Sequence, residues 1–312
     1  MLALLLAALF PVVLPMLLGL LLDRLLGEAR RFHPLVGFGR YAAAVERLLR
    51  RLGNHRGVGL LAWSAAVLPW VALAGSLREA DAWLGLALDI GLLYFALGGR
   101  SLAEHARAVG APLARGDLAG ARQRLSWIVS RDTAELDESG VAKATVESVL
   151  ENGNDAVFGA LFWFALLGGP GAVMFRLANT LDAMWGYRTE RYLRFGWAAA
   201  RIDDVLNFIP ARLTALSYAL LGHTANALRC WRTQAPAWDS PNAGPVMAAG
   251  AGALDLCLGG PAIYHGQLES RPPLGVGAPA RGADIDKALA LVNNSVWLWV
   301  LAVAGVSALI HA

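Results

Sequence analysis

The chain has 312 residues, of which 56% are hydrophobic and only 16% are charged, and its mean hydropathy is +0.47. Because soluble domains usually carry about a quarter charged residues, this composition favours a membrane protein and argues against a soluble fold. The net charge of +3 comes from arginines beside apolar runs, which is not the pattern of a nucleic-acid-binding protein. Two isolated cysteines, Cys230 and Cys257, are too few for a disulfide framework or a zinc site.

Five apolar runs predict membrane helices: residues 1–22, 57–77, 82–99, 157–175 and 288–310. A spanning helix needs about 20 predominantly apolar residues, and at least three of these runs meet that length. The first run lacks a basic start and a clear small-residue cleavage site, so it is interpreted as a retained helix and not as a signal peptide. We therefore predict an all-α, polytopic membrane protein, with a single integral membrane domain over residues 1–312.

The arginines indicate how the chain is oriented. Residues 23–56 carry eight arginines against three acidic residues, which by the positive-inside rule places this loop in the cytoplasm. Residues 100–156 then form a second cytoplasmic loop, which we expect to be helical. A stretch rich in Gly and Pro within residues 259–288 predicts an exposed loop. Residues 205–221 and 243–258 are apolar but interrupted, and their topology stays open.

The apolar segment after residue 157 is broken by Gly168-Gly169-Pro170-Gly171. Each half has about 11 residues, or about 16 Å of helix, so neither half alone crosses a hydrocarbon core of about 30 Å. The segment is either one kinked span or a re-entrant hairpin that returns to the cytoplasmic side. We favour the hairpin because it keeps the polar groups on both flanks in one compartment.

Acidic residues gather just before this segment. Residues 137–152 predict a helix with Glu147 and Glu151 at i and i+4, which places both carboxylates on one face. Asp155 continues that face only if the helix runs past Gly153. Like charges at this spacing destabilise an isolated helix, and a cation such as Mg²⁺ would compensate them. The alternative is a solvated acidic helix face.

Two further polar clusters lie within apolar helical sequence. Asn179 and Asp182 follow Arg176 at helical spacing. The second cluster contains Arg201, Asp203, Asp204, Asn207 and Arg212. Ionisable groups at membrane depth cost about 2.5–3.5 kcal/mol each on insertion scales, and they usually face a cavity or a partner. Three successive clusters of acids and amides with interleaved arginines favour a metal–phosphate site over a structural ion pair.

Several motifs occur in a fixed order along the chain. They are Ser126-Trp127-Ile128-Val129-Ser130-Arg131-Asp132-Thr133, Glu151-Asn152 with Asp155, Asn179-Thr180-Leu181-Asp182-Ala183-Met184-Trp185-Gly186-Tyr187, Ala200-Arg201-Ile202-Asp203-Asp204-Val205 and Pro210-Ala211-Arg212-Leu213. His33-Pro34, Gly39-Arg40, Gly99-Arg100-Ser101-Leu102, Ser240-Pro241-Asn242 and Leu258-Gly259-Gly260-Pro261 accompany them. Over nearly its whole length the chain resembles the adenosylcobinamide-phosphate synthases, the CbiB/CobD membrane family of cobalamin biosynthesis. Glu28 stands where many members have Asp, and Val246-Met247 where many have Ser-Glu.

The resemblance implies an ATP-dependent amide ligase of the bacterial cytoplasmic membrane, with its active site facing the cytoplasm. It would join adenosylcobyric acid to (R)-1-amino-2-propanol O-2-phosphate and give adenosylcobinamide phosphate through an acyl phosphate. ATP and Mg²⁺ are the expected cofactors, and the cobalt corrinoid is a substrate. The lipid bilayer is an expected partner and nucleic acid is not. Other enzymes of the cobalamin pathway are candidate partners, and the oligomeric state stays open.

This activity gives the polar residues expected roles. The catalytic candidates are Asp182, Asp203, Asp204 and Glu151, with Asp182 or Asp204 as the base that deprotonates the amine. The metal candidates are Glu147, Glu151, Asp155 and Asp182. Substrate and phosphate contacts are expected from Arg131, Asp132, Asn179, Tyr187, Arg188, Arg201, Arg212, His33, Arg40, Arg100, Ser240 and Asn242. The alternatives are a membrane phospho- or prenyl-transferase that uses Mg-diphosphate chemistry, and a non-catalytic transporter.

Overall fold

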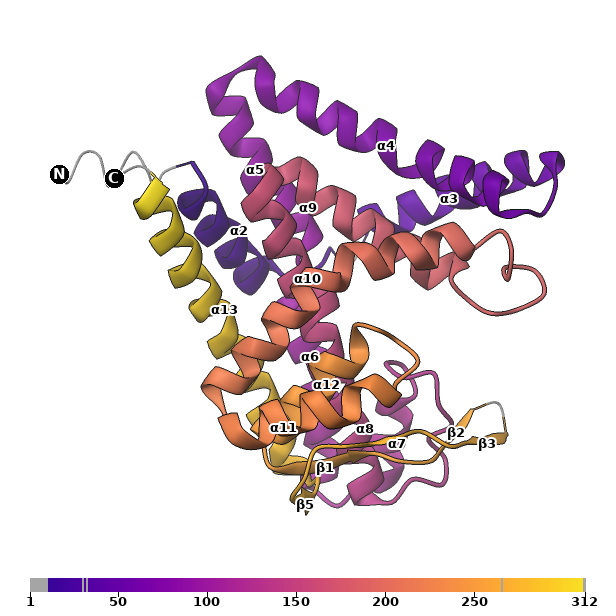
Figure 1. The fold of residues 1–312 in the computed structure, drawn as a ribbon, viewed down its shortest axis with the longest axis vertical. Coiled ribbons are helices and arrows are strands. Elements are labelled where there is room, and N and C mark those ends of the chain that lie inside the picture. The colour runs from indigo at the N-terminus through magenta and orange to yellow at the C-terminus, as the bar shows by residue number, and fades with distance from the viewer. Residues whose placement is uncertain (1–10, 30, 32, 265, 311–312) are drawn as a thin grey trace. The chain divides into compact units, whose positions relative to one another are not determined.

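The computed structural model describes residues 11–29, 31, 33–264 and 266–310, and helices make up most of the chain (Figure 1). In chain order the α-helices are α2 (Val13–Leu26), α3 (Pro34–Leu49), α4 (Arg56–Ala80), α5 (Ala82–Ala96), α6 (Gly99–Ala114), α7 (Leu118–Leu125), α8 (Glu138–Gly153), α9 (Gly159–Trp185), α10 (Trp197–Leu221), α11 (Thr224–Gln234), α12 (Ala243–Ala253) and α13 (Gly282–Ile310). Two 3-10 helices, η1 (Arg50–Leu52) and η3 (Ala235–Ala237), and a π-helical turn, η2 (Asn154–Phe158), complete the helical elements of these residues.

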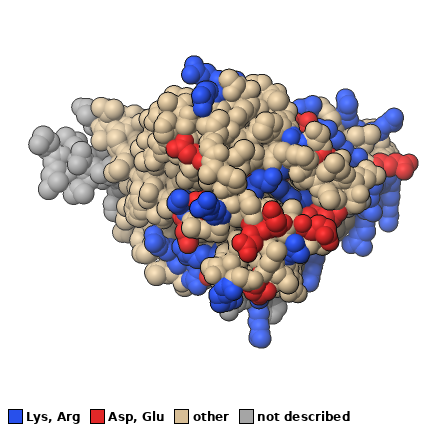
Figure 2. All heavy atoms as spheres, turned by 90° about the horizontal axis from the view of Figure 1, so that it is seen from below, with Lys and Arg blue, Asp and Glu red and all other residues tan. Residues whose placement is uncertain are grey.

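Within the described residues, four helical stretches are long and apolar enough to cross a membrane: Arg56–Ala80, Ala82–Ala114, Glu138–Trp185 and Gly282–Ile310. They contain four of the predicted apolar runs, and the polytopic all-α class is confirmed. The remaining run, residues 1–22, begins outside the described residues and continues into α2. Large apolar side chains such as Leu68, Trp70 and Leu301 are exposed, as lipid-facing side chains are. Uncharged residues cover most of the face drawn in Figure 2, and charged side chains occur there in small groups.

The chain forms two compact units. Unit 1 comprises Met1–Gly99, Asp155–Asn207 and Val300–Ala312, and unit 2 comprises Arg100–Asn154 and Phe208–Trp299. In unit 1, α9 packs against α3, α4 and α5, and α2 packs against α5. In unit 2, α12 packs against α8 and α11.

In unit 1, α9 is a hairpin of two arms and not a straight helix. Gly168 has φ +68° and ψ −156° inside it. A Cβ atom on Gly171 would overlap the carbonyl oxygen of Trp163, and one on Gly159 would overlap the ring of Phe175. In a straight helix, residues eight apart are separated by about 12 Å. Both contacting pairs are centred on residue 167, so the two arms run antiparallel. The hairpin shape is confirmed, and its return to the cytoplasmic side stays a prediction.

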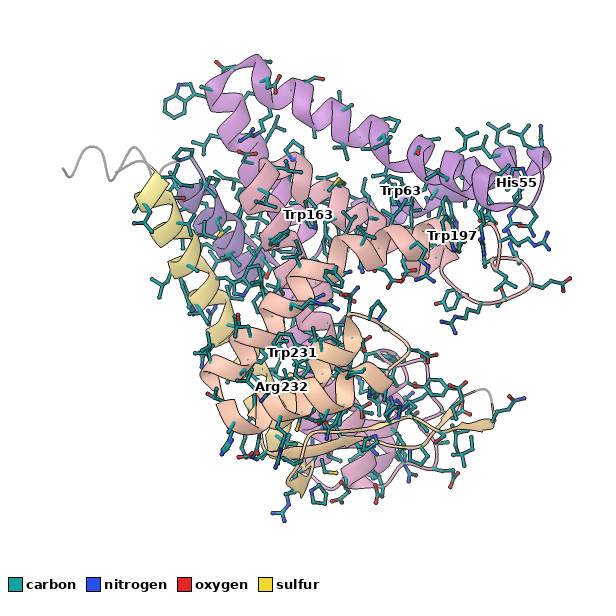
Figure 3. The ribbon with its side chains drawn as sticks, viewed as in Figure 1. His55, Trp63, Trp163, Trp197, Trp231 and Arg232 are labelled. Carbon is teal, nitrogen blue, oxygen red and sulfur yellow. The ribbon has the colours of Figure 1, made fainter. Side chains whose placement is uncertain are left out.

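A buried carboxylate fixes the bend of this hairpin. Asp89 of α5 accepts a hydrogen bond from the backbone N–H of Gly169 at 2.7 Å. It also accepts from Nε of Arg78 at 2.9 and 3.0 Å. An N–H at the start of a helical arm has no partner within the helix, and buried charge requires pairing. Asp89 therefore caps the second arm while Arg78 neutralises it. Trp163, labelled in Figure 3, anchors the first arm by donating to the carbonyl of Leu206 at 3.0 Å.

In unit 2, α8 and α12 form the core. Most residues of α8 are buried, including Val146, Val149 and Leu150. A Cβ atom on Gly250 of α12 would overlap the side chain of Leu150, so the small residues of α12 allow α8 to approach closely. Residues 100–156 are helical as predicted, but α8 is a core helix and not a solvated one.

Residues 256–279 of unit 2 contain short strands. Strand β1 (Leu256–Gly259) pairs antiparallel with β4 (Pro273–Leu274) and parallel with β5 (Ala278–Pro279). Strands β2 (Ala262–Tyr264) and β3 (Gln267–Glu269) form a separate antiparallel ribbon. The predicted loop over residues 259–288 therefore contains strands and the start of α13. Strands β3 and β5 are exposed, as predicted. Leu274 of β4 and Ile285 of α13 are buried, a contact that local composition does not reveal.

Candidate functional site

The second arm of α9 and the first turns of α10 meet around a carboxylate in unit 1. Asp203 accepts a hydrogen bond from Nδ2 of Asn179 at 3.4 Å and another from Nδ2 of Asn207 at 3.1 Å. Asn207 is one turn further along α10, so helical geometry alone brings it to Asp203. The contact with Asn179 requires the two helices to pack. The structure thus brings together two of the three predicted polar clusters.

The negative charges of two other aspartates, Asp155 and Asp182, act on Asp203. Burial raises the pKa of this carboxyl group well above its usual value, and the charges of Asp155 and Asp182 raise it further. The two amide hydrogen bonds lower the pKa but do not compensate for these effects. Asp155, Asp182 and Asp203 therefore form one electrostatically linked group, although they lie on η2, α9 and α10. Such a group favours either a shared proton or a bound cation.

Asp204 has different surroundings from its neighbour. Its carboxylate lies 3.6 Å from a guanidinium nitrogen of Arg201, and the charge of Arg188 also acts on it. Burial nevertheless raises its pKa above the usual value, because desolvation outweighs the two arginines. Its side chain is 31% exposed, so substrate can reach it. A raised pKa together with access is what a general base requires near neutral pH.

Arg176 is a buried cation that the sequence placed near the site without a role. Its guanidinium lies 3.6 Å from Glu28, and the charges of Asp155 and Asp23 also act on it. Its Nε atom has no hydrogen-bond partner among the described residues. Glu28 also lies 3.7 Å from Nε2 of His33. A carboxylate is thus present where many family members carry Asp, and it serves as the partner of Arg176.

His33 has a structural role in addition. Its Nδ1 accepts a hydrogen bond from the N–H of Leu35 at 3.2 Å and caps α3. Arg40, on the same helix, is exposed. The neighbouring Gly39 lies close to Met184 of α9, which brings α3 near the end of the second arm.

Gly98 and Gly99 let the chain after α5 approach the carboxylates of Glu28 and Asp23, which lie near Arg176. The N–H of Gly98 donates to the carbonyl of Ala156 at 3.0 Å. A Cβ atom on Gly98 would lie 3.3 Å from Glu28, and one on Gly99 would lie 3.0 Å from a carboxylate oxygen of Asp23. The sequence indicated Arg100 as the functional residue of this motif. The structure instead makes the glycines the residues that reach the cluster, while Arg100 in unit 2 binds Glu104 at 2.6 Å.

The segment after Asp182 is fixed by aromatic packing. Trp185 is buried and lies edge-on to Phe195 at 5.1 Å. A Cβ atom on Gly186 would overlap the side chain of Asp182, so glycine makes room for this carboxylate. Tyr187 is 60% exposed. Tyr187 is therefore free to contact substrate, whereas Trp185 serves the fold.

A network that sequence reasoning missed holds the loop that follows. Glu46 of α3 is bound by Arg50 and Arg191, each at 2.8 Å. Arg50 also donates to the backbone carbonyl of Arg191 at 2.8 Å and lies over the ring of Phe195. The sequence signal was an acid–arginine pair at i and i+4 on α3. This network fixes the loop that carries Arg188.

In unit 2, Glu147 is the centre of a buried ion-pair group. It is bound by Arg131 and Arg271, and its Oε1 accepts from the N–H of Gly259 at 2.7 Å. We expected Glu147 to bind metal, but two guanidinium groups and a backbone amide already occupy this carboxylate. That arrangement gives the expected metal role no support. Glu151, one turn further along α8, is only partly buried.

The π-helical turn η2 explains why the expected acidic face does not continue. It extends the helix past Gly153, but a π turn changes the register of the residues that follow. Asp155 then belongs to unit 1, whereas Glu147 and Glu151 belong to unit 2. The sequence-based set of metal ligands is therefore divided between the two units.

The other residues of unit 2 that we expected to contact substrate form hydrogen bonds within the protein, mostly to backbone groups. Asp132 accepts from the N–H of Gly266 at 2.9 Å, and its own N–H donates to the carbonyl of Ile263 at 2.8 Å. It thus ties the Ser126–Thr133 motif to the β2–β3 ribbon. Arg212 donates to Oδ1 of Asn242 at 2.8 Å and to the carbonyl of Pro241 at 3.0 Å. Ser240 accepts from the N–H of Ala243 at 3.1 Å at the start of α12.

Among the described residues, no three His, Cys, Asp or Glu side chains converge on a ready-made cation site. Mg²⁺ in phosphoryl-transfer sites is usually held by one or two carboxylates together with substrate phosphates and water. Asp155, Asp182 and Asp203 offer the oxygen donors that this ion prefers, in a group with excess negative charge. These residues fit Mg²⁺ bound together with a phosphorylated substrate.

Comparison with known proteins found one family model and several similar proteins that match most of the chain. The family model described as CobD/Cbib protein matches residues 16–292. A protein named cobalamin biosynthesis protein CobD from Chromobacterium violaceum is 59% identical, over 93% of this chain and 96% of that protein. Proteins of the same name from Stutzerimonas stutzeri and Mycobacterium tuberculosis are 60% and 42% identical, over 89% and 86% of this chain and 92% and 87% of their own lengths. No solved structure matches.

Proposed function

Because this chain belongs to the CobD/CbiB family of cobalamin biosynthesis proteins, we propose that it is an ATP-dependent amide ligase. Its substrates would be adenosylcobyric acid and (R)-1-amino-2-propanol O-2-phosphate, and its product adenosylcobinamide phosphate. The observation that carries the proposal is the partly buried, electrostatically linked group of Asp155, Asp182 and Asp203, next to the partly exposed Asp204. It provides both a place for a cation and a base.

The first step of the proposed reaction activates the corrinoid carboxylate. A carboxylate oxygen attacks the γ-phosphorus of ATP, the bond between that phosphorus and the β–γ bridging oxygen breaks, and an acyl phosphate and ADP form. Phosphoryl transfer depends mainly on positioning and on charge neutralisation. One or two of the carboxylates of Asp155, Asp182 and Asp203 would hold Mg²⁺ together with the substrate phosphates, and the ion when bound would neutralise charge on the phosphates. Arg188 and Arg201, beside Asp204, would orient phosphate oxygens through paired N–H donors.

The second step forms the amide. The amine nitrogen attacks the acyl carbon, the C–O bond to phosphate breaks, and inorganic phosphate leaves. The nitrogen must lose a proton, and Asp204 is the residue best suited to accept it. Its pKa is raised by burial, so it is a stronger base than an ordinary carboxylate, and its side chain is accessible.

The test is an assay of the purified full chain in lipid nanodiscs. We expect ATP consumption to require both the corrinoid and the amino-alcohol phosphate, with one amide formed per ATP. Transfer from a diphosphate donor without ATP would instead favour the membrane transferase. Movement of a ligand across the bilayer without turnover would favour the transporter.

We also propose that this site faces the cytoplasm of a bacterial inner membrane. The arginine-rich segment before α4 and the return of the α9 hairpin support this orientation. A Tyr187→Cys variant in a background without Cys230 and Cys257 reports it, because Tyr187 is exposed. A membrane-impermeant thiol reagent should label this cysteine only when it has access to the cytoplasmic side. Labelling from the periplasm of intact cells would contradict the orientation.

A further inference from the structure

Unit 2 contains a group of cations that its own carboxylate does not neutralise. Arg131 and Arg271 both bind Glu147, and their side chains are only 8% and 12% exposed. Lys143 lies one turn before Glu147 on α8, and its Nζ donates to the carbonyl oxygen of Gly259 at 2.9 Å. Two arginines thus share one carboxylate, and the partner of the nearby lysine is a neutral backbone carbonyl. Burying charge without compensation is costly, so the group favours the binding of an anion.

The cations converge on the turn after β1. Gly259 and Gly260 both have positive φ, at +68° and +77°. Lys143 binds the carbonyl of Gly259, and Nε of Arg271 binds the carbonyl of Gly260 at 3.1 Å. A Cβ atom on Gly259 would overlap the carbonyl of Pro272, whereas none of the described atoms lies within 4 Å of a Cβ position on Gly260. The turn is therefore packed on one side and has open space on the other.

A second observation indicates a ligand at this place. The indole Nε1 of Trp238 is buried and has no hydrogen-bond partner among the described residues. The guanidinium carbon of Arg271 lies 5.4 Å from the centre of the Trp238 ring. Buried indole N–H groups usually have an acceptor. The unused donor beside Arg271 therefore suggests an acceptor supplied by a bound molecule.

We propose that the Gly259–Gly260 turn, with Arg131, Lys143, Arg271 and the indole N–H of Trp238, binds the phosphate group of a substrate. A phosphate monoester presents several charged oxygens at once, and guanidinium, ammonium and indole N–H groups are the donors that match them. The inference rests on the proposed function for the statement that the phosphate belongs to a substrate. Under that function, two molecules carry such a group: the nucleotide and the amino-alcohol phosphate.

The experiment measures binding without turnover. Isothermal titration of inorganic phosphate into the full chain in nanodiscs should give saturable binding in the absence of corrinoid. Lys143→Met should weaken binding at least tenfold, because hydrogen bonds to charged groups are the stronger ones. Trp238→Phe, which removes only the N–H donor, should weaken it about threefold to tenfold. Competition with ADP and with phosphoethanolamine distinguishes the two sources of phosphate.

Matched controls exist in the same unit. Lys287→Met removes an equal charge, since lysine occurs in this chain at positions 143 and 287, and Lys287 pairs with Asp284. Trp231→Phe and Arg232→Gln change residues of α11, labelled in Figure 3, and serve as controls for Trp238→Phe and for the loss of a cation. The controls should bind phosphate as the wild type does.

Three results would overturn the inference: no saturable phosphate binding, equal weakening in the Lys143 and Lys287 variants, or phosphate that neither ADP nor phosphoethanolamine displaces. Displacement by either compound supports it. Binding is measured apart from amide formation. Lost binding with intact ligase activity would therefore reject the phosphate site and not the proposed function, and the reverse result would do the opposite.

Discussion

The two units contain polar groups of opposite charge balance. In unit 1, Asp155, Asp182 and Asp203 act on one another. In unit 2, Arg131 and Arg271 share the carboxylate of Glu147, and Lys143 and Arg271 bind the carbonyls of the Gly259–Gly260 turn. Excess negative charge raises carboxyl pKa values and favours a cation or a proton, whereas excess positive charge favours an anion. In both units, glycines bring the backbone close to the charged groups. Residues that were predicted to form one metal–phosphate site thus belong to two groups of opposite charge.

The largest expected effect is on amide formation, through the base that we propose in unit 1. Asp204→Asn keeps the shape of the side chain but cannot accept the proton from the amine. General base catalysis typically contributes about 10²–10⁴-fold, so amide formation should fall by that factor, with the melting midpoint little changed. Steady-state assays of the purified variant measure it.

Asp286→Asn is the control, because its side chain is 76% exposed in unit 2. It should retain wild-type activity. Wild-type activity in the Asp204 variant would remove this residue from the mechanism and leave Asp182 as the candidate base.

The second effect tests whether Glu147 of unit 2 is structural. Glu147→Ala leaves two buried guanidinium groups without their carboxylate, and breaking a buried ion pair costs about 3–5 kcal/mol. The apparent melting midpoint should fall strongly, with or without Mg²⁺. A variant as stable as the wild type that had lost Mg²⁺ binding would restore the metal role we first expected.

A smaller effect is expected at the bend of the α9 hairpin in unit 1. Asp89→Ala removes the cap of the second arm and the partner of Arg78, and a buried group left unsatisfied costs about 1–3 kcal/mol. Asp81 caps the start of α5 in an exposed position, so Asp81→Ala should cost about 1 kcal/mol. Denaturation in detergent compares the two variants. Equal costs would show that burial adds nothing at Asp89.

The smallest effect concerns pH. The pKa of Asp203 is raised above its usual value of 3.8, so the folded protein binds this proton more tightly than the unfolded chain does. Its contribution to stability is therefore present at low pH and is lost as the pH rises through the raised pKa. The Asp203→Asn variant has no carboxyl group to ionise, so it does not lose this contribution to stability as the pH rises. The variant should melt a few degrees above the wild type at pH 8 and at the same temperature near pH 4.

The opposite change in melting temperature at pH 8 would also be informative. If Asp203→Asn melts below the wild type at pH 8, the hydrogen bonds from Asn179 and Asn207 stabilise a charged carboxylate more than burial destabilises it. In that case a cation near Asp155 and Asp182 would be the simpler explanation of the group.

Local pattern in the sequence was enough for the long apolar helices, whereas residues 205–221 and 243–258 stayed open. The apolar runs predicted the long helices α4, α5 and α13 because lipid requires about 20 apolar residues in succession. The Gly168–Gly171 break predicted the hairpin because each half is too short to span a bilayer. The contact between Asp203 and Asn207 was not predicted, although residues four apart share a helix face.

Tertiary structure decided which carboxylates belong together. Glu147 and Asp155 are eight residues apart, and helical spacing predicted one face for them only if the helix ran past Gly153. The π turn and the packing of α8 against β1 give them different partners. Gly98, Arg176, Trp238 and Arg271 were missed as site residues because their roles depend on contacts between segments far apart in the sequence. The sequence by itself determined the long apolar helices and the break at Gly168–Gly171, since these are local properties. Charge balance depends on distances across the fold, and only packing sets those distances.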